Sequence, residues 1–495
     1  MKPLFIFLLG CCPLLLPAQT GIDFSTFFYD QTLRIDYYHT GNATEEFLSL
    51  DRLYSQGIWA GYRGNLIQNY DMGKYSAKVY DLASNTLIFS TGYSTTFSEY
   101  QTTGPALNGV RRTYHETVLI PRPKNKFLFV IEKRDAYNLL SHVYQQVIDP
   151  NDYHIIAEAQ KRSPDEITVV EKNGDPHTSV DLVIIGEGYA EGEQKTFKKD
   201  LEYFTGVFFS IEPYMGQRKK FNITGIFTPS GENGTDEPRQ GRFRNTVLGS
   251  SFNTFDSDRY LLADDNKTLR DIAAQVPYDA VLVMVNLDRY GGGGIFNWQT
   301  VFATGSPQRD YVFLHEFGHA FAGLGDEYYT SSVSYENFYP AGIEPTDPNV
   351  TALLDPQNLK WKDLVSPGIT IPTDWGKPVF DSLNHALSLL TKEKTDALQV
   401  LKKSDASSGA IYGTENNFDN RILSLRAQID SFLFNHPLKG KIGAFEGAGY
   451  QSEGLYRPTV NSMMHRFDPG RRSFEAVNER AIRKMIDFYT EEKTK

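Results

Sequence analysis

Hydrophobic and polar residues alternate in short runs through the first third of the chain. Every second residue is hydrophobic in Leu33–Tyr37 and again in Tyr75–Val79, which is the period of a strand with one buried face. Phe127–Ile131 is a continuous hydrophobic run, and glycine, asparagine and proline residues separate such segments. Short strands with this punctuation predict a β-sandwich, which we place in a β-rich N-terminal domain over residues 19–162.

The pattern changes after a polar segment at residues 161–166. Val180–Ile185 and Asp279–Val285 have the composition of interior strands. Between them, hydrophobic residues recur at the spacing of one helix face, at Phe197, Leu201, Phe204 and Phe208. Strand, helix and strand in this order predict an α/β domain over residues 163–495, so the predicted fold class is α+β or α/β.

Two further parts of this second domain have a helical pattern. A polar insertion over residues 330–440 contains a predicted helix pair at about residues 380–403 and 417–434. Near the C-terminus, residues 474–489 form a predicted closing helix. Its periodic hydrophobic positions are Val477, Ala481, Met485 and Phe488.

A helix at residues 309–322 carries the candidate chemistry. Ser306 and Pro307 precede it, which predicts an N-cap at Ser306 and proline at the first helical position. We expect one face to pack into the core, made of Leu314, Phe317 and Phe321. His315 and His319 lie four residues apart, so their rings meet on another face of the helix.

Two imidazoles one helical turn apart are a common way to bind Zn²⁺. Glu316 projects beside the metal position, which suits a general base that removes a proton from water. Gly323, Leu324 and Gly325 end the helix and bring Asp326 back towards it. We assign Asp326 as the third ligand; Glu327 and a glutamate from a later helix are the alternatives.

Ser462-Met463-Met464-His465 looks like the methionine turn that supports the zinc site in metzincins, with Met464 beneath the site. His465 or Arg466 is a candidate oxyanion donor, although packing is the simpler role for both.

The glycine-rich segment Tyr290–Phe296 is either an edge that pairs with an extended peptide or a mobile loop.

Four aspartates form an acidic patch whose spacing fits no EF-hand, so we expect a solvated loop rather than a Ca²⁺ site. These residues are Asp256, Asp258, Asp264 and Asp265. The formal net charge is −11, and no run of five or six basic residues occurs. We therefore expect neither nucleic acid nor an anionic membrane surface as a partner.

The N-terminus has the pattern of an export signal. Lys2 precedes apolar residues, and Pro17-Ala18-Gln19 offers a small-residue cleavage site, which predicts a signal peptide over residues 1–18. We therefore expect a secreted, periplasmic or surface location, with lipidation at Leu8-Leu9-Gly10-Cys11 as the alternative. Both cysteines lie inside this segment, and no later segment approaches the ~20 apolar residues of a membrane span.

Several segments resemble the IgA-peptidase-like family of bacterial zinc metallopeptidases. They are His315–Tyr328, Pro345–Thr351, Leu359–Leu364, Phe445–Tyr450 and Tyr456–Pro458. The resemblance implies a metzincin-like α/β fold, zinc ligands at His315, His319 and Asp326, and a base at Glu316. This chain departs from the family near the methionine turn, where many relatives carry cysteine and this chain has Ser462, Glu475 and Asn478.

These observations predict a secreted zinc-dependent endopeptidase that acts on protein or peptide substrates. An exported binding or adhesion protein with a vestigial metal site is one alternative, although such a site has no need of the Glu316 base. A zinc amidase that acts on cell-wall peptides is the other.

Overall fold

The structure is a computed structural model that describes residues 21–157, 166–331, 333–336, 338–471 and 473–490. The predicted signal peptide lies outside these residues. The predicted domain boundary near residue 162 lies outside them too.

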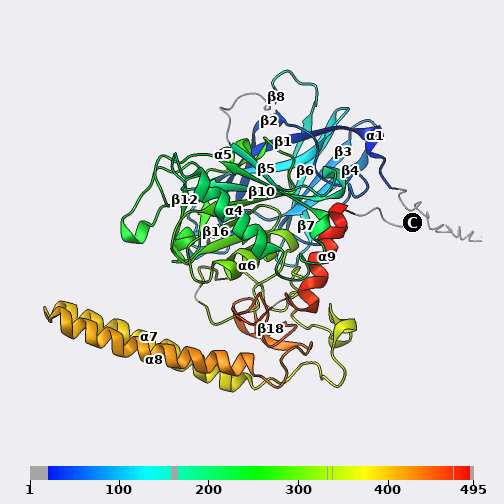
Figure 1. The fold of residues 1–495 in the computed structure, drawn as a ribbon. Coiled ribbons are helices and arrows are strands. Elements are labelled where there is room, and N and C mark those ends of the chain that lie inside the picture. The colour runs from blue at the N-terminus through cyan, green and yellow to red at the C-terminus, as the bar shows by residue number, and fades with distance from the viewer. Residues whose placement is uncertain (1–20, 158–165, 332, 337, 472, 491–495) are drawn as a thin grey trace, which may run out of the picture.

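The N-terminal part is a sandwich of two four-stranded sheets (Figure 1). One sheet has the order β5-β1-β2-β8, with strands β1 (Phe28–Gly41), β2 (Glu46–Ser55), β5 (Arg112–Pro123) and β8 (Ile156–Ala157). The other has the order β4-β3-β6-β7, with strands β3 (Tyr75–Asp81), β4 (Thr86–Tyr93), β6 (Phe127–Arg134) and β7 (Leu140–Ile148). Ile35 from the first sheet and Val79 from the second share one hydrophobic core, so the predicted β-sandwich is confirmed.

Three short helices belong to this N-terminal part. They are α1 (Phe24–Phe27), α2 (Thr96–Tyr100) and α3 (Gly104–Leu107). Thr95 and Ser98 form a capping box that fixes the start of α2, so the buried Glu99 of this helix has a set position.

The second part is built on a six-stranded sheet of order β15-β16-β14-β10-β11-β9. Its strands are β9 (Glu166–Glu171), β10 (Val180–Glu187), β11 (Phe221–Phe227), β14 (Ala280–Val285), β15 (Gly292–Ile295) and β16 (Gln299–Ala303). The four inner strands are parallel, whereas β15 and β9 run antiparallel at the two edges. Every residue of β10 is buried, as expected for a strand that is covered on both faces.

Helices α4 (Gln194–Phe208), α6 (Arg309–Ala322) and α9 (Ala476–Thr490) share one core with one face of this sheet. The other face is covered by helix α5 (Asn266–Ala273) and by a two-stranded sheet made of β12 (Ser250–Ser251) and β13 (Leu262–Ala263). The predicted face of α4 is fully buried, and the predicted closing helix corresponds to α9. The mixed α/β second part is therefore confirmed.

The N-cap predicted for the α6 helix is wrong. The cap position is Gln308, which makes no side-chain cap bond. The Ser306 hydroxyl accepts from the Gln308 N–H at 3.2 Å, and its carbonyl accepts from the Arg309 N–H at 3.0 Å. Ser306 and Pro307 thus form a turn ahead of the helix, because the hydroxyl bonds a donor only two residues away.

The predicted helix pair is a long hairpin that projects from the body, at the lower left of Figure 1, made of α7 (Lys377–Lys403) and α8 (Ser408–Phe434). Helix α8 begins at Ser408 rather than near Asn417, because Ser407 caps it and Lys394 of α7 forms ion pairs with Glu415 and Asp419. A hydrophobic cluster packs the base of the hairpin against β17 (Phe445–Ala448), which pairs with β18 (Gln451–Arg457).

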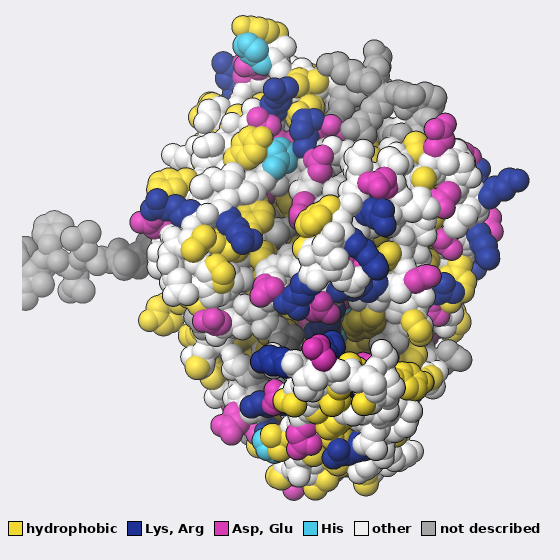
Figure 2. Space-filling view, turned by 90° about the vertical axis from the view of Figure 1, so that its left-hand side faces the viewer, with side chains coloured by type: hydrophobic (Ala, Val, Ile, Leu, Met, Phe, Trp, Pro, Cys, Tyr) yellow, Lys and Arg dark blue, Asp and Glu magenta, His cyan; other side chains and the backbone are white. Residues whose placement is uncertain are grey.

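On the side of the molecule from which this hairpin projects, Lys and Arg side chains are interspersed with Asp and Glu side chains (Figure 2). Within the described residues, no helix combines the length and the apolar composition that a membrane crossing requires.

Candidate active site

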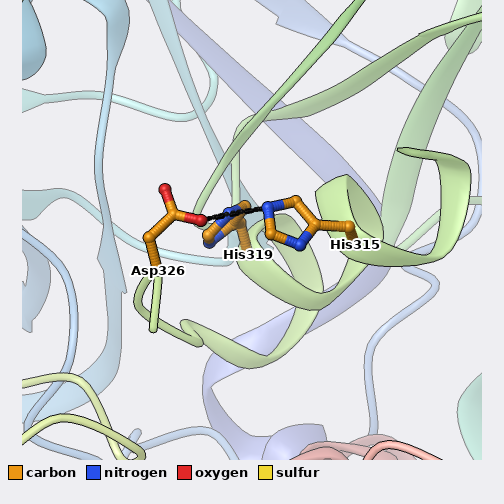
Figure 3. A group of neighbouring side chains, drawn as sticks. All are labelled: His315, His319 and Asp326. Carbon is orange, nitrogen blue, oxygen red and sulfur yellow. Dashed lines mark hydrogen bonds and ion pairs between the residues drawn. The ribbon is translucent and has the colours of Figure 1, made fainter. Parts of the chain in front are cut away.

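The two histidines of α6 point their Nε2 atoms at the same place. These atoms lie 3.1 Å apart (Figure 3). The Nδ1 atom of His315 faces the Met463 carbonyl at 2.9 Å, and Nδ1 of His319 faces the Leu324 carbonyl. A carbonyl only accepts hydrogen bonds, so each Nδ1 carries a proton and each Nε2 atom is left to bind a cation or a second proton.

Asp326 completes this group. Its Oδ1 atom lies 3.0 Å from Nε2 of His315 and 3.3 Å from Nε2 of His319 (Figure 3). Its Oδ2 atom accepts a hydrogen bond of 2.6 Å from the Tyr450 hydroxyl. Oδ1 is buried and has no hydrogen-bond partner among the residues that the structure describes.

The arrangement of these donor atoms fits a divalent cation. The ligand atoms of His315, His319 and Asp326 all lie within 4.8 Å of one another. Two imidazole lone pairs and a carboxylate oxygen repel at such distances unless a proton or a cation lies between them. Two nitrogen donors and one oxygen donor are also a set that catalytic zinc sites use, with a further position left open.

Neighbouring charges strongly favour positive charge at this point. Burial disfavours protonation of His319, but Asp326 outweighs burial and raises the pKa of His319 to about 9. Burial also raises the pKa of Asp326, yet His319 and His315 hold that pKa well below its usual range. The pKa of Glu316 is raised by burial, against the pull of His315 and His319.

Glu327, the alternative third ligand, points away from this group. Its carboxylate accepts hydrogen bonds from the Ser462 hydroxyl at 2.6 Å and from the side-chain amides of Asn349 and Asn478 at 2.9 Å each. Glu327 is fully buried. It therefore joins three distant segments of the chain, and this bracing role was not apparent from the sequence.

The end of α6 positions both a histidine and the aspartate. Gly323 is left-handed (φ +60°), and its N–H donates to the His319 carbonyl at 3.0 Å, as predicted for a glycine that ends the helix. The reversed chain brings the Leu324 carbonyl to the His319 ring. Asp326 follows two residues later and faces the histidines.

The predicted methionine turn lies directly against the helix. Met464 is fully buried, and a Cβ on Gly318 would lie 3.1 Å from its sulfur atom. The Met463 carbonyl accepts from His315, and the Met464 carbonyl accepts from the Glu327 N–H at 2.8 Å. The turn therefore fixes one histidine ring and the chain that carries Asp326.

His465 and Arg466, the oxyanion donors considered from the sequence, have packing roles. His465 is buried with its Nδ1 atom 3.0 Å from the Asn461 side-chain oxygen. Arg466 forms an ion pair with Asp430 of α8. Neither is among the described residues that line the cavity beside the histidines.

This cavity has a volume of about 460 Å³ and is lined by the His315, Glu316, His319 and Asp326 side chains. Arg259 and Tyr328 also line it, and the Arg259 guanidinium donates to the Tyr328 hydroxyl at 3.0 Å. The Tyr328 ring lies nearly parallel to that of His315, with the centroids 6.3 Å apart. Arg259 comes from an irregular loop far away in sequence, so no motif could have identified it.

Strand β15 contains the glycine-rich segment and forms the edge of the sheet above α6. A Cβ on Gly294 would lie 2.1 Å from the Glu316 carbonyl oxygen, so only glycine permits this close approach. The segment is thus an ordered strand rather than a mobile loop.

The outer edge of β15 is partly paired already. Gly292 exchanges backbone hydrogen bonds with Arg259 and Leu261. Beyond the strand, the Phe296 carbonyl accepts from the N–H of Ser94 in the N-terminal part, at 2.9 Å. Any extended peptide that pairs with this edge therefore has to fit between these two contacts.

Three of the four aspartates of the acidic patch bind other groups of the protein. Asp256 pairs with Arg239, Asp258 pairs with Arg289, and Asp265 caps α5. Within the part of the chain that the structure describes, the one cluster of three or more His, Cys, Asp or Glu side chains that could hold a metal ion is His315, His319 and Asp326.

Comparison with known families gives two matches. The family described as IgA Peptidase M64 matches residues 168–486, and the Peptidase M64 N-terminus matches residues 23–145. No curated protein matches the chain significantly. The first match spans well over half of the 495 residues and contains α6 and the methionine turn. The chain therefore belongs to the IgA peptidase M64 family and is a peptidase.

Proposed function

We propose that this protein is an exported, zinc-dependent endopeptidase in which His315, His319 and Asp326 hold the metal ion. The observation that carries the proposal is the convergence of two Nε2 atoms and one carboxylate oxygen without a hydrogen-bond partner on a single point beside a cavity. When bound there, a zinc ion supplies Lewis acidity, which polarises a carbonyl and lowers the pKa of water.

Glu316 is the general base in this proposal. Its side chain lines the cavity next to both histidines, and it is partly exposed to that space. It removes a proton from the attacking water and then passes this proton to the amine of the leaving peptide. Its raised pKa suits both directions of transfer, since a carboxylate of ordinary pKa is a weak base near neutral pH.

Arg259 and Tyr328 are the proposed donors to the oxyanion that forms when water attacks the peptide carbonyl. Both side chains face the cavity and bond to each other, so their positions are set before substrate arrives.

Export is supported by the residue pattern of the first 18 positions. Intact-mass measurement of the secreted protein tests it, and distinguishes cleavage after residue 18 from lipidation.

Digestion of casein and of short peptides tests the proposed activity. We expect the wild type to cleave internal peptide bonds, a chelator to stop cleavage, and added Zn²⁺ to restore it. Glu316→Gln should lower kcat by at least ~10³-fold, since general acid–base catalysis contributes on this order. The variant should keep the wild-type Tm and zinc content. Equal activity of wild type and variant on every substrate would falsify the role of Glu316, and cleavage of cell-wall peptides alone would favour an amidase.

A further inference from the structure

The N-terminal sandwich forms a wall of the active-site cavity. The cavity that contains Glu316 is also lined by Lys74, Lys133 and Arg134 of the N-terminal sandwich. These three side chains lie at one end of strands β3 and β6, which pair with each other. A substrate that fills the cavity therefore contacts both parts of the chain.

Two of these three cations have partners within the protein. The Lys133 ammonium lies 2.7 Å from Oε1 of Glu46. The Arg134 guanidinium donates to the carbonyls of Gly73 and Asn138 and pairs with Asp71. Their charge and hydrogen-bonding capacity are largely used inside this wall.

Lys74 differs from both, because its ammonium group has no ion-pair or hydrogen-bond partner among the described residues, and Glu46 and Asp135 attract it only from a greater distance. Burial, together with repulsion from Lys133, lowers the pKa of Lys74 to about 8. The side chain is therefore still mainly protonated at neutral pH, and it is only partly exposed. Burying part of an unpaired cation costs free energy, because the cation loses water without gaining a partner. An anionic group that binds the cation offsets this cost.

Backbone hydrogen bonds hold Lys74 in place in the wall of the cavity. The Lys74 N–H donates to the Ser94 hydroxyl at 3.1 Å, and its carbonyl accepts from the Arg134 N–H at 2.9 Å. Ser94 in turn donates to the carbonyl of Phe296, directly after strand β15. Lys74 is therefore tied through one residue to the edge strand that packs on the Glu316 helix.

We propose that Lys74 is a specificity-determining residue that binds a carboxylate of the peptide substrate. The inference rests on the proposed peptidase function and names a substrate class for it, namely peptides that carry a carboxylate at a set distance from the cleaved bond. The carboxylate belongs either to an aspartate or glutamate side chain or to a free C-terminus. The N-terminal sandwich is accordingly part of the substrate-binding site.

Three sets of otherwise identical fluorogenic peptides test this proposal on the full, zinc-loaded enzyme. The first set has neutral side chains and an amidated C-terminus, the second has one acidic side chain moved along an amidated peptide, and the third is neutral with a free C-terminus of varied distance. We expect kcat/KM of the wild type to favour one position in the second or third set over the first by ~10- to 100-fold, the range of a charge-assisted hydrogen bond. The set that gains identifies the source of the carboxylate.

In Lys74→Met, kcat/KM for the favoured acidic peptide should fall to within ~2-fold of that for the neutral peptide, because the charge-assisted contact is lost. Lys126→Met is the matched control: it lies in the same sandwich, is largely exposed, and should keep the wild-type preference. The comparison is a ratio within each variant, so a loss of folded protein does not affect it. Lys74→Gln repeats the test with a polar side chain.

The outcomes separate this inference from the proposed function. A wild type that cleaves none of the peptides, nor casein, overturns both. A wild type that cleaves all three sets alike, or a Lys74→Met variant that keeps the preference, overturns the role of Lys74 and leaves the peptidase intact.

Discussion

The orientation of two imidazole rings is the residue-scale feature on which the site depends. In each ring one nitrogen is committed to a backbone carbonyl, of Met463 for His315 and of Leu324 for His319. These carbonyls belong to the methionine turn and to the turn that ends α6. Backbone groups thus select the tautomer that leaves Nε2 free, which is a common device at metal sites.

Asp326 and Glu327 are adjacent in sequence and differ in their predicted effects on metal binding. Asp326→Ala should weaken zinc affinity by more than ~100-fold, because loss of a ligand exceeds the 10- to 100-fold cost of losing an outer-shell partner. Glu327→Gln should retain about one zinc ion per chain, since it keeps most bonds to Ser462, Asn349 and Asn478. Its free energy of unfolding should fall by at most ~2 kcal/mol.

Competition with a chelating dye and denaturant titration measure these two quantities on the same preparations. If Glu327→Gln loses zinc while Asp326→Ala keeps it, the assignment of the third ligand is reversed.

Arg259 should act on the chemical step. Arg259→Gln removes a fixed cationic donor from the cavity, and we expect kcat to fall on the order of 100-fold with KM changed little, because the donor bonds the oxyanion only in the transition state. Arg239→Gln is the control, since Arg239 is exposed and pairs with Asp256 at the surface. Steady-state kinetics on one neutral peptide measure kcat and KM for both variants. A rise in KM alone for Arg259→Gln would show that Arg259 binds substrate rather than the oxyanion.

At the scale of elements, local periodicity was sufficient for most strands and helices. The alternating residues of β3 and the four hydrophobic positions of α4 are buried as predicted, because a one-sided pattern has one stable orientation. The motif that begins on α6 predicted a group of two histidines and Asp326, and the structure brings these three residues together. Positions that depend on contacts between distant segments were missed, among them Arg259 and the Asn349 brace of Glu327. The Ser306 cap failed because a favourable cap residue also forms other turns.

The outer half of the α7–α8 hairpin is predicted to be dispensable for folding and for cleavage of short peptides. Its buried side chains lie towards the base, at Phe380, Leu390, Ile422, Ile429 and Leu433. Replacing residues 394–418 with a four-residue Gly/Asn turn keeps all five. We expect Tm to fall by no more than about 3 °C and kcat/KM to stay within ~2-fold, because little apolar surface is lost.

Differential scanning calorimetry and peptide kinetics on this shortened chain provide the measurement. A large loss of activity at unchanged Tm would show that the hairpin contributes to the active site itself.

At the scale of the whole molecule, the two parts of the chain are joined by buried polar contacts. The Arg34 guanidinium of β1 is fully buried and forms an ion pair with Asp271 of α5 at 2.7 Å. The Glu99 carboxylate of α2 accepts hydrogen bonds from the hydroxyls of Tyr260 and Tyr335, both of which line the cavity. The sandwich therefore holds the walls of the active site as well as lining it.

This coupling predicts that the two parts unfold together. Asp271→Ala removes a carboxylate that pairs with the buried Arg34 guanidinium. We expect this change to lower the free energy of unfolding by ~2–4 kcal/mol. The whole transition should move to lower temperature as a single step. Calorimetry on the wild type and on Asp271→Asn, which keeps an oxygen acceptor, completes the comparison. Two separate transitions, with only the first one shifted, would show that the parts are independent.

The most direct measurement is anomalous X-ray diffraction at the zinc absorption edge, on crystals of the zinc-loaded protein. We predict one strong peak between Nε2 of His315, Nε2 of His319 and an oxygen of Asp326, at about 2.0–2.2 Å from each. A site without a peak, with both imidazoles still directed at Oδ1 of Asp326, would contradict the metal-dependent mechanism.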